Sequence, residues 1–297
     1  MSHQHAHEHA THQHGAHEHA THEHGGPDEE ALTELLDLDG EVLAGYLDQA
    51  TAWIAATAEP PVTRVVDLGT GTGTGTFALL RRFPEARVTA VDLAPDRLTR
   101  LRHRACELGL DGRVDVVAAD LDQSWPELGP ADLVWTSMAL HHVADPDQAL
   151  TRILGLLRPG GALVVAETSA LESFPRFLPA GAESGLEDRL HHLLVSRLGQ
   201  QVPELGADWG ARLTAAGFDV TASRTFAVTL EPPLPPQAGR YAQLTLDRLR
   251  SGLGDGLDPA DQQALAALVA DEGPDSVRHR ADLTVRATRL AWLARRP

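Results

Sequence analysis

The residues best suited to hold a polar ligand form one short segment, Asp67-Leu-Gly-Thr-Gly-Thr-Gly73. An apolar run containing Val65, Val66 and Leu68 predicts a buried strand before the glycines, and Phe77 begins an apolar pattern that predicts a helix after them. A strand, a glycine-rich turn and a helix place backbone N–H groups and a helix N-terminus beside a ligand. Glycine suits this turn because a side chain would block the approach of backbone to ligand.

Further polar side chains fall where later strands are predicted to end. Asp92 closes an apolar run and lies 23 positions after Gly69. At that spacing a carboxylate at the end of the second strand meets the ribose hydroxyls of a nucleotide held at the first turn. The carboxyl ends of parallel strands form one edge of a sheet, and ligands bind there. The polar residues expected at or near this edge are Asp67, Asp92, Asp120, Ser137, His141 and Glu167.

These residues must be positioned by the elements between them. Five apolar segments, beginning near residues 64, 87, 114, 131 and 162, alternate with helical patterns. This alternation predicts an α/β fold with a doubly wound, mostly parallel sheet. Arg158-Pro-Gly-Gly161 is expected to be a tight turn into the fifth strand. A strand at 218–230, a helical excursion and a final strand at 281–293 would add an antiparallel edge.

Helices outside the alternation predict a cap over the sheet. We expect cap helices at about 28–58, 169–206 and 236–272, within one domain covering 28–297. Within 28–58, Asp39-Gly40 should separate two helices. Tyr46 and Trp53 of the second helix are expected in the core, with ligand enclosure as the alternative.

Composition restricts the partners and the compartment. The formal net charge of −17 argues against a nucleic-acid backbone or an anionic membrane surface as the main partner. No apolar run approaches the roughly 20 residues that span a bilayer. A single cysteine, Cys106, excludes an internal disulfide framework. We therefore expect a cytoplasmic protein; its oligomeric state stays open.

Residues 1–27 differ from the rest of the chain. They carry ten of the 16 histidines in a near-repeat and lack apolar residues larger than alanine after Met1, so this tail is expected to be disordered. Imidazoles two residues apart can chelate zinc, nickel or copper. The alternative is a solubilising tail or an affinity tag. The candidate metal ligands are His3, His5, His7, His9, His12, His14, His17, His19, His22 and His24.

The glycine segment does not fit two common nucleotide motifs. Gly-x-Gly-x-x-Gly fails, because Thr74 or Thr76 occupies the sixth place, and the Gly-Lys ending of a P-loop is missing. The segment resembles the first motif of class I S-adenosylmethionine-dependent methyltransferases of the small-molecule type. The resemblance extends through Asp92, Asp120 and the turn at 158–161, covering roughly residues 60–167. It implies a seven-stranded Rossmann-like sheet that ends in a reversed hairpin.

The resemblance also implies roles for individual residues. Gly69, Gly71 and Gly73 would approach the amino-acid part of S-adenosylmethionine, with Asp67 near its amino group. Asp92 would accept hydrogen bonds from the ribose, and Asp120 would border the adenine. For each of these two acids the alternative is that it only caps a helix. The remaining cofactor-binding candidates are Leu93, Leu121 and Ser137.

The expected reaction is methyl transfer to a small-molecule acceptor, mainly by holding donor and acceptor in line. His141 or His142 could act as a base or line the site. Arg240, Tyr241 and Arg289 could contact an acidic acceptor from the cap. An alternative function is a metal-handling or sensing protein in which the histidine tail binds the metal and the nucleotide site is regulatory.

Overall fold

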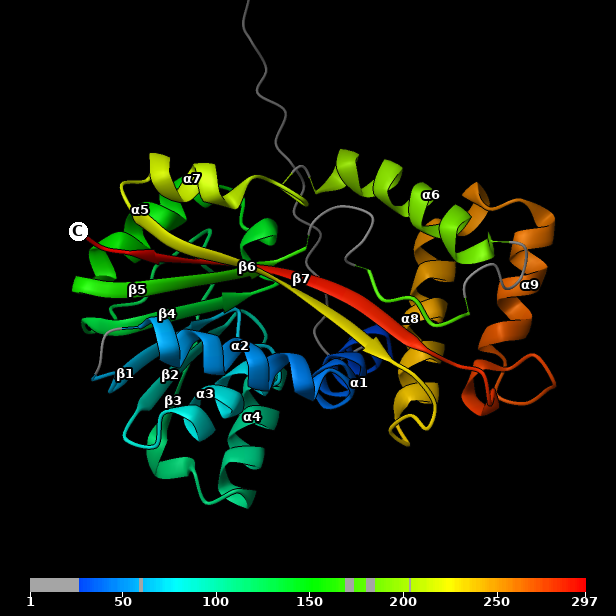
Figure 1. Ribbon diagram of the computed structural model, residues 1–297, viewed down its shortest axis with the longest axis horizontal. Coiled ribbons are helices and arrows are strands. Elements are labelled where there is room, and N and C mark those ends of the chain that lie inside the picture. The colour runs from blue at the N-terminus through cyan, green and yellow to red at the C-terminus, as the bar shows by residue number, and fades with distance from the viewer. Residues whose placement is uncertain (1–26, 59–60, 169–173, 180–184, 203) are drawn as a thin grey trace, which may run out of the picture.

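One seven-stranded sheet organises the protein, with the strand order β3-β2-β1-β4-β5-β7-β6 (Figure 1). The computed structural model describes residues 27–58, 61–168, 174–179, 185–202 and 204–297. Neighbouring strands from β3 to β5 are parallel, whereas β7 is antiparallel to both β5 and β6. The strands are β1 (Arg64–Leu68), β2 (Arg87–Asp92), β3 (Val114–Ala118), β4 (Ala131–Ser137), β5 (Leu157–Glu167), β6 (Asp219–Leu230) and β7 (Val285–Arg295). The predicted fold class is confirmed.

Helices cover both faces and one end of the sheet. Figure 1 shows α2, α3 and α4 on one face and α5 and α7 on the other, while α1, α6, α8 and α9 gather beyond the end to which β6 points. Among these, α8 contacts α1, α6 and α9. The helices are α1 (Pro27–Val42), α2 (Ala44–Thr57), α3 (Thr74–Arg82), α4 (Pro95–Glu107), α5 (Pro146–Leu156), α6 (Leu186–Gln201), α7 (Trp209–Ala215), α8 (Ala238–Leu253) and α9 (Pro259–Val269).

The strands alternate their side chains between two buried clusters, as a pleated strand must. Val65 and Trp135 belong to the cluster that includes α2, α3 and α8, whereas Val66 and Val134 belong to the one that includes α5 and α7. Both faces are apolar, which explains why these strands are nearly continuous hydrophobic runs. Among the residues described, no helix is long and apolar enough to cross a membrane.

The helix break expected at Asp39-Gly40 is wrong. The first helix continues to Val42, and the second begins at Ala44. A Cβ on Gly40 would lie 2.3 Å from Cγ2 of Thr74 at the start of α3. Gly40 therefore allows α1 to pack closely on the glycine-rich turn, and it does not end the helix.

Two strand boundaries also differ from expectation. The tight turn expected at residues 158–161 lies inside β5, which begins at Leu157, and the pairing of β4 with β5 shifts register there. Gly160, with a left-handed φ of +74°, donates its N–H to the Arg296 carbonyl, and the Gly161 carbonyl accepts from the Arg296 N–H. Residues 158–161 thus bulge out of the pairing with β4, opposite Asp132, and are held by hydrogen bonds to Arg296. The final strand begins at Val285 rather than at residue 281.

Candidate cofactor and acceptor site

The glycine-rich turn between β1 and α3 depends on left-handed backbone at alternate positions. Gly69, Gly71 and Gly73 have φ angles of +70°, +56° and +89°. This conformation costs an L-residue roughly 1–2 kcal/mol, which explains the glycine at every second place. The Gly69 and Thr70 N–H groups donate to the Val91 carbonyl at 2.9 and 3.0 Å. The turn is thereby fixed against the end of β2.

Asp92 joins this turn to the start of α4. Its Oδ2 accepts the Gly71 N–H at 2.7 Å, and its Oδ1 accepts the Ala94 N–H at 2.9 Å. The carboxylate is buried, yet each oxygen keeps lone-pair capacity for another donor. Leu93, the next residue, is 57% exposed. A carboxylate with spare acceptor capacity beside an exposed apolar side chain suits a ligand that combines hydroxyls with a flat apolar ring.

Asp67 lies inside the turn. Its Oδ2 accepts hydrogen bonds from the hydroxyls of Thr70 (3.0 Å) and Thr76 (2.6 Å). Burial raises the pKa of Asp67 to about 6, although the two threonine hydroxyls oppose the shift. Asp67 therefore holds both sides of the turn together. The two threonines were not expected at the site, because their partner is visible only in the folded turn.

Asp120 organises its own loop beyond β3. Its carboxylate accepts the Asp122 N–H at 2.9 Å and the Gln123 side-chain amide at 2.7 Å. The Ala119 N–H donates to the Asp92 carbonyl at 3.0 Å, so this loop begins beside the end of β2. Leu121 is partly buried against the cluster that includes α5. A turn and not a helix follows Asp120, so the helix-capping alternative does not hold, and a role toward adenine stays a prediction.

The loop after β4 is held by Glu167, the last residue of β5. Its Oε1 accepts the N–H groups of Ala139 (3.2 Å) and Leu140 (3.1 Å), and its Oε2 lies 2.6 Å from Nδ1 of His141. Both His141 and Glu167 are buried. The strand-end pattern placed Glu167 at this edge, but its role as the holder of His141 was missed.

The two histidines of this loop lie against each other. The ring centroids of His141 and His142 are 4.1 Å apart, and burial lowers the pKa of His142, with His141 contributing. With Glu167 beside Nδ1 of His141, the ring is held so that Nε2 is the nitrogen left to accept a proton. Ser137, at the end of β4, is partly buried and close to Tyr46 of α2.

Neighbouring segments enclose the glycine-rich turn. A Cβ on Gly69 would lie 2.3 Å from the Cβ of Ala139 in the loop after β4, and one on Gly71 would lie 3.6 Å from Leu36 of α1. The structure therefore brings together the turn, Asp92, the His141 loop and α1. The tail histidines lie outside the described residues. Within the described part of the chain, no group of three or more histidine, cysteine or acidic side chains could hold a metal.

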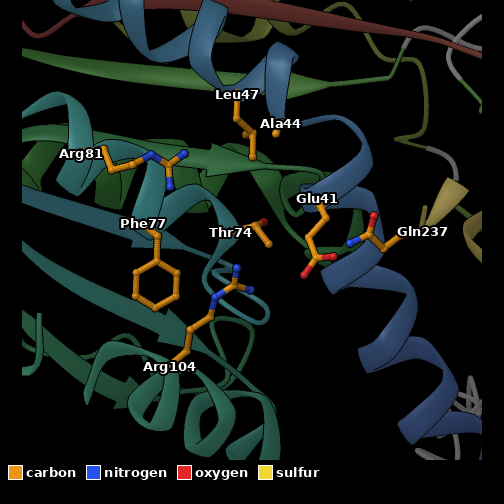
Figure 2. A pocket seen from close by; sticks show the side chains of 9 residues that line it. Glu41, Ala44, Leu47, Thr74, Phe77, Arg81, Arg104 and Gln237 are labelled. Atoms are coloured by element: carbon orange, nitrogen blue, oxygen red, sulfur yellow. The ribbon is translucent and has the colours of Figure 1, made fainter. Parts of the chain in front are cut away.

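Two cavities lie along α1, one beside the start of α3 and the other against α4. Figure 2 shows the smaller, of about 360 Å³, where Arg81 and Arg104 extend toward Phe77 and Thr74 and face Glu41 across the opening. The larger, of about 650 Å³, lies between α1 and α4 and shares Glu41 and Arg104 with the first. Neither lining includes the strand-end acids Asp67, Asp92, Asp120 and Glu167 or the histidines His141 and His142.

The hydrogen bonds of the turn restrict the ligand. The N–H groups of Gly69, Thr70, Gly71 and Gly73 all donate within the protein. A turn that binds pyrophosphate needs such groups free to face the phosphates. Beside this turn lie instead the Asp92 carboxylate and the exposed Leu93, which fit S-adenosylmethionine, a cofactor without phosphate. The fold and the site together define a nucleoside-binding α/β protein of the methyltransferase class.

Comparisons with known proteins also indicate a methyltransferase. Residues 65–161 match the model of a methyltransferase domain. A trans-aconitate 2-methyltransferase of Methylobacterium nodulans is 31% identical over 209 residues, covering 70% of this chain and 74% of that protein. A malonyl-[acyl-carrier protein] O-methyltransferase of Halorhodospira halophila is 36% identical over 173 residues, covering 57% of this chain and 54% of that protein. The chain thus spans only about half the length of this second relative.

A solved structure shows the same fold. The crystal structure of a candidate methyltransferase from Bacillus halodurans C-125 aligns with this protein with a TM-score of 0.51 and 19% identity. The alignment includes 83% of this chain and 98% of the other. The matching domain model and the sequence relatives show that the chain belongs to the family of class I S-adenosylmethionine-dependent methyltransferases.

Proposed function

We propose that this protein transfers the methyl group of S-adenosylmethionine to a small-molecule acceptor. The observation that carries the proposal is the buried Asp92 carboxylate, which is held by the Gly71 N–H and lies next to the exposed Leu93. When bound, S-adenosylmethionine supplies a methyl group already activated on its sulfonium. The residues that would hold it are Asp67, Gly69, Gly71, Gly73, Asp92, Leu93, Asp120, Leu121 and Ser137.

The protein's own contribution is to position the two reactants and exclude water. His141 and His142 would line the acceptor side of the site. Held by Glu167, His141 could accept a proton at Nε2 from an acceptor that must lose one. An acceptor that reacts as a carboxylate needs no base, because the anion is already the nucleophile.

The relatives support a carboxylic acid as the acceptor. Their names give trans-aconitate and a malonyl group on acyl-carrier protein as the molecules they methylate, and both carry carboxylates. We propose a free small molecule, with no nucleic-acid or membrane partner, and a cytoplasmic location. The net charge of −17 supports the exclusion of nucleic acid.

Calorimetry with S-adenosylmethionine tests the proposal. Wild type should bind it with micromolar affinity, and Asp92→Asn should bind at least about tenfold more weakly, which is about 1.4 kcal/mol. Asp96→Asn is the matched control, since Asp96 is an exposed carboxylate four residues away in the first turn of α4. Absence of binding by the wild-type protein would refute the proposal.

Metal binding by the histidine tail stays a separate prediction from sequence. Deleting residues 2–25 should abolish binding of zinc, nickel or copper and leave S-adenosylmethionine affinity unchanged. Unchanged metal stoichiometry in the deletion variant would remove this prediction.

A further inference from the structure

A largely buried polar cluster lies where α1, α2 and α8 meet β7. It consists of Asp39, Tyr46, Tyr241 and Arg289. Nη2 of Arg289 is 3.3 Å from Oδ1 of Asp39, and the Tyr241 hydroxyl donates to the same oxygen at 2.5 Å. The Tyr46 hydroxyl is also buried and has no partner in good hydrogen-bond geometry among the described residues. Four elements thus contribute polar groups to this cluster, and of its four residues Asp39 alone is partly exposed.

The ion pair in this cluster is asymmetric. The Arg289 side chain is 6% exposed, whereas that of Asp39 is 37% exposed. A buried guanidinium needs an anionic partner in every state, because desolvating it costs several kcal/mol, so a carboxylate that leaves must be replaced by another anion. A carboxylate on a partly exposed helix can leave more easily than the arginine can. Asp39 therefore has the character of an exchangeable counter-ion for a fixed cation.

The position of the cluster fits the second reactant of the proposed function. Arg289 precedes Leu290, which pairs with Glu167 at the end of β5. In the strand order, β4 and β5 separate β7 from the glycine-rich turn after β1. Tyr46 reaches toward Ser137 at the end of β4. The cluster thus lies at the ligand-binding edge, separated by β4 and β5 from the cofactor residues that follow β1 and β2.

We propose that this cluster binds a carboxylate group of the methyl acceptor. The acceptor carboxylate replaces Asp39 as a partner of Arg289 and accepts hydrogen bonds from the hydroxyls of Tyr46 and Tyr241. This inference rests on the proposed function and names where the acceptor is anchored, which need not be the atom that is methylated.

Two further observations favour these residues. Burial raises the pKa of Tyr46 to about 12 and that of Tyr241 well above 10, so both hydroxyls stay protonated donors at neutral pH. Arg240, which was expected to be equally suited, forms two hydrogen bonds to the carboxylate of Glu34, at 2.8 and 2.7 Å, and is partly exposed. Arg240 thus serves as a matched control.

The test uses calorimetry on the full chain saturated with S-adenosylhomocysteine, the demethylated product. The probes are trans-aconitate, citrate and succinate, each compared with its uncharged amide. Wild type should bind at least one acid and not its amide. Arg289→Gln should weaken that binding at least about tenfold, Arg240→Gln should leave it unchanged, and Asp39→Asn should tighten it severalfold because the competing carboxylate is gone.

The sign of the Asp39→Asn effect separates this proposal from a purely structural ion pair, in which both substitutions weaken binding. If Arg289→Gln fails to fold, Arg289→Lys takes its place, because it keeps the charge. Its affinity for the acid should be lower than that of wild type but still measurable. If S-adenosylmethionine binds but no acid binds to wild type or Asp39→Asn, the inference is wrong and the proposed function stands. If S-adenosylmethionine itself does not bind, the proposed function fails first.

Discussion

Gly69 should be more sensitive to substitution than its backbone angle alone explains. Gly69→Ala places a methyl group 2.3 Å from the Cβ of Ala139, a separation that requires one segment to move. The left-handed φ of +70° adds roughly 1–2 kcal/mol of strain, and overpacking typically adds about 1–3 kcal/mol. We expect Gly69→Ala to lower the free energy of unfolding by roughly 2–5 kcal/mol in total.

The chain offers a control that isolates the strain. Gly109 has nearly the same φ, +66°, but a Cβ there meets nothing within 4 Å. Gly109→Ala should therefore cost only the roughly 1–2 kcal/mol of backbone strain. The difference between the two variants measures the collision with Ala139.

A double-mutant cycle completes the test. Ala139→Gly removes the colliding methyl group, so Gly69→Ala combined with Ala139→Gly should recover about 1–3 kcal/mol relative to the sum of the single effects. Urea unfolding of the four proteins gives these free energies. S-adenosylmethionine affinity should recover in parallel. Strictly additive effects, or equal losses for Gly69→Ala and Gly109→Ala, would show that the two loops do not touch.

Three further outcomes can be checked by urea unfolding. Glu167→Ala should lower the free energy of unfolding by about 3 kcal/mol or more, because three donors, two of them buried, lose their acceptor. Glu167→Gln keeps an acceptor and should lower it by about 1 kcal/mol, and equal losses for the two variants would contradict this. Burial raises the pKa of Asp67 from 3.8 to about 6, so its contribution to stability is greatest below pH 4 and falls by roughly 3 kcal/mol as pH rises to 6. Asp67→Asn should remove that pH dependence, and an unchanged profile would refute the assignment. Arg113→Ala should lower the free energy of unfolding by about 2–3 kcal/mol, because Arg113 donates to three carbonyls near the end of α3. A loss below about 0.5 kcal/mol would contradict this prediction.

Local patterns predicted the parts of the site that are local in sequence. The alternating glycines and the spacing to Asp92 follow from one strand–turn–helix–strand unit, so their positions could be derived. The helix end expected at Gly40 was wrong, because this glycine is needed for the close approach of Thr74, 34 positions later, and not for a turn. The partnership of Asp39 with Arg289 spans 250 residues. A sequence pattern cannot predict such a pair, because the pair forms only once β7 has taken its place in the sheet.

The place of β7 in the sheet has a consequence for how the protein is made. Of the strands in the described residues, β7 comes latest in the sequence, yet it lies between β5 and β6 rather than at an edge. During synthesis, β5 and β6 must each wait with an unpaired edge until the chain has passed Arg295. Such edges recruit other chains, and long-range pairing is slow to form. Truncation within residues 285–295 should therefore produce aggregation rather than a smaller folded enzyme.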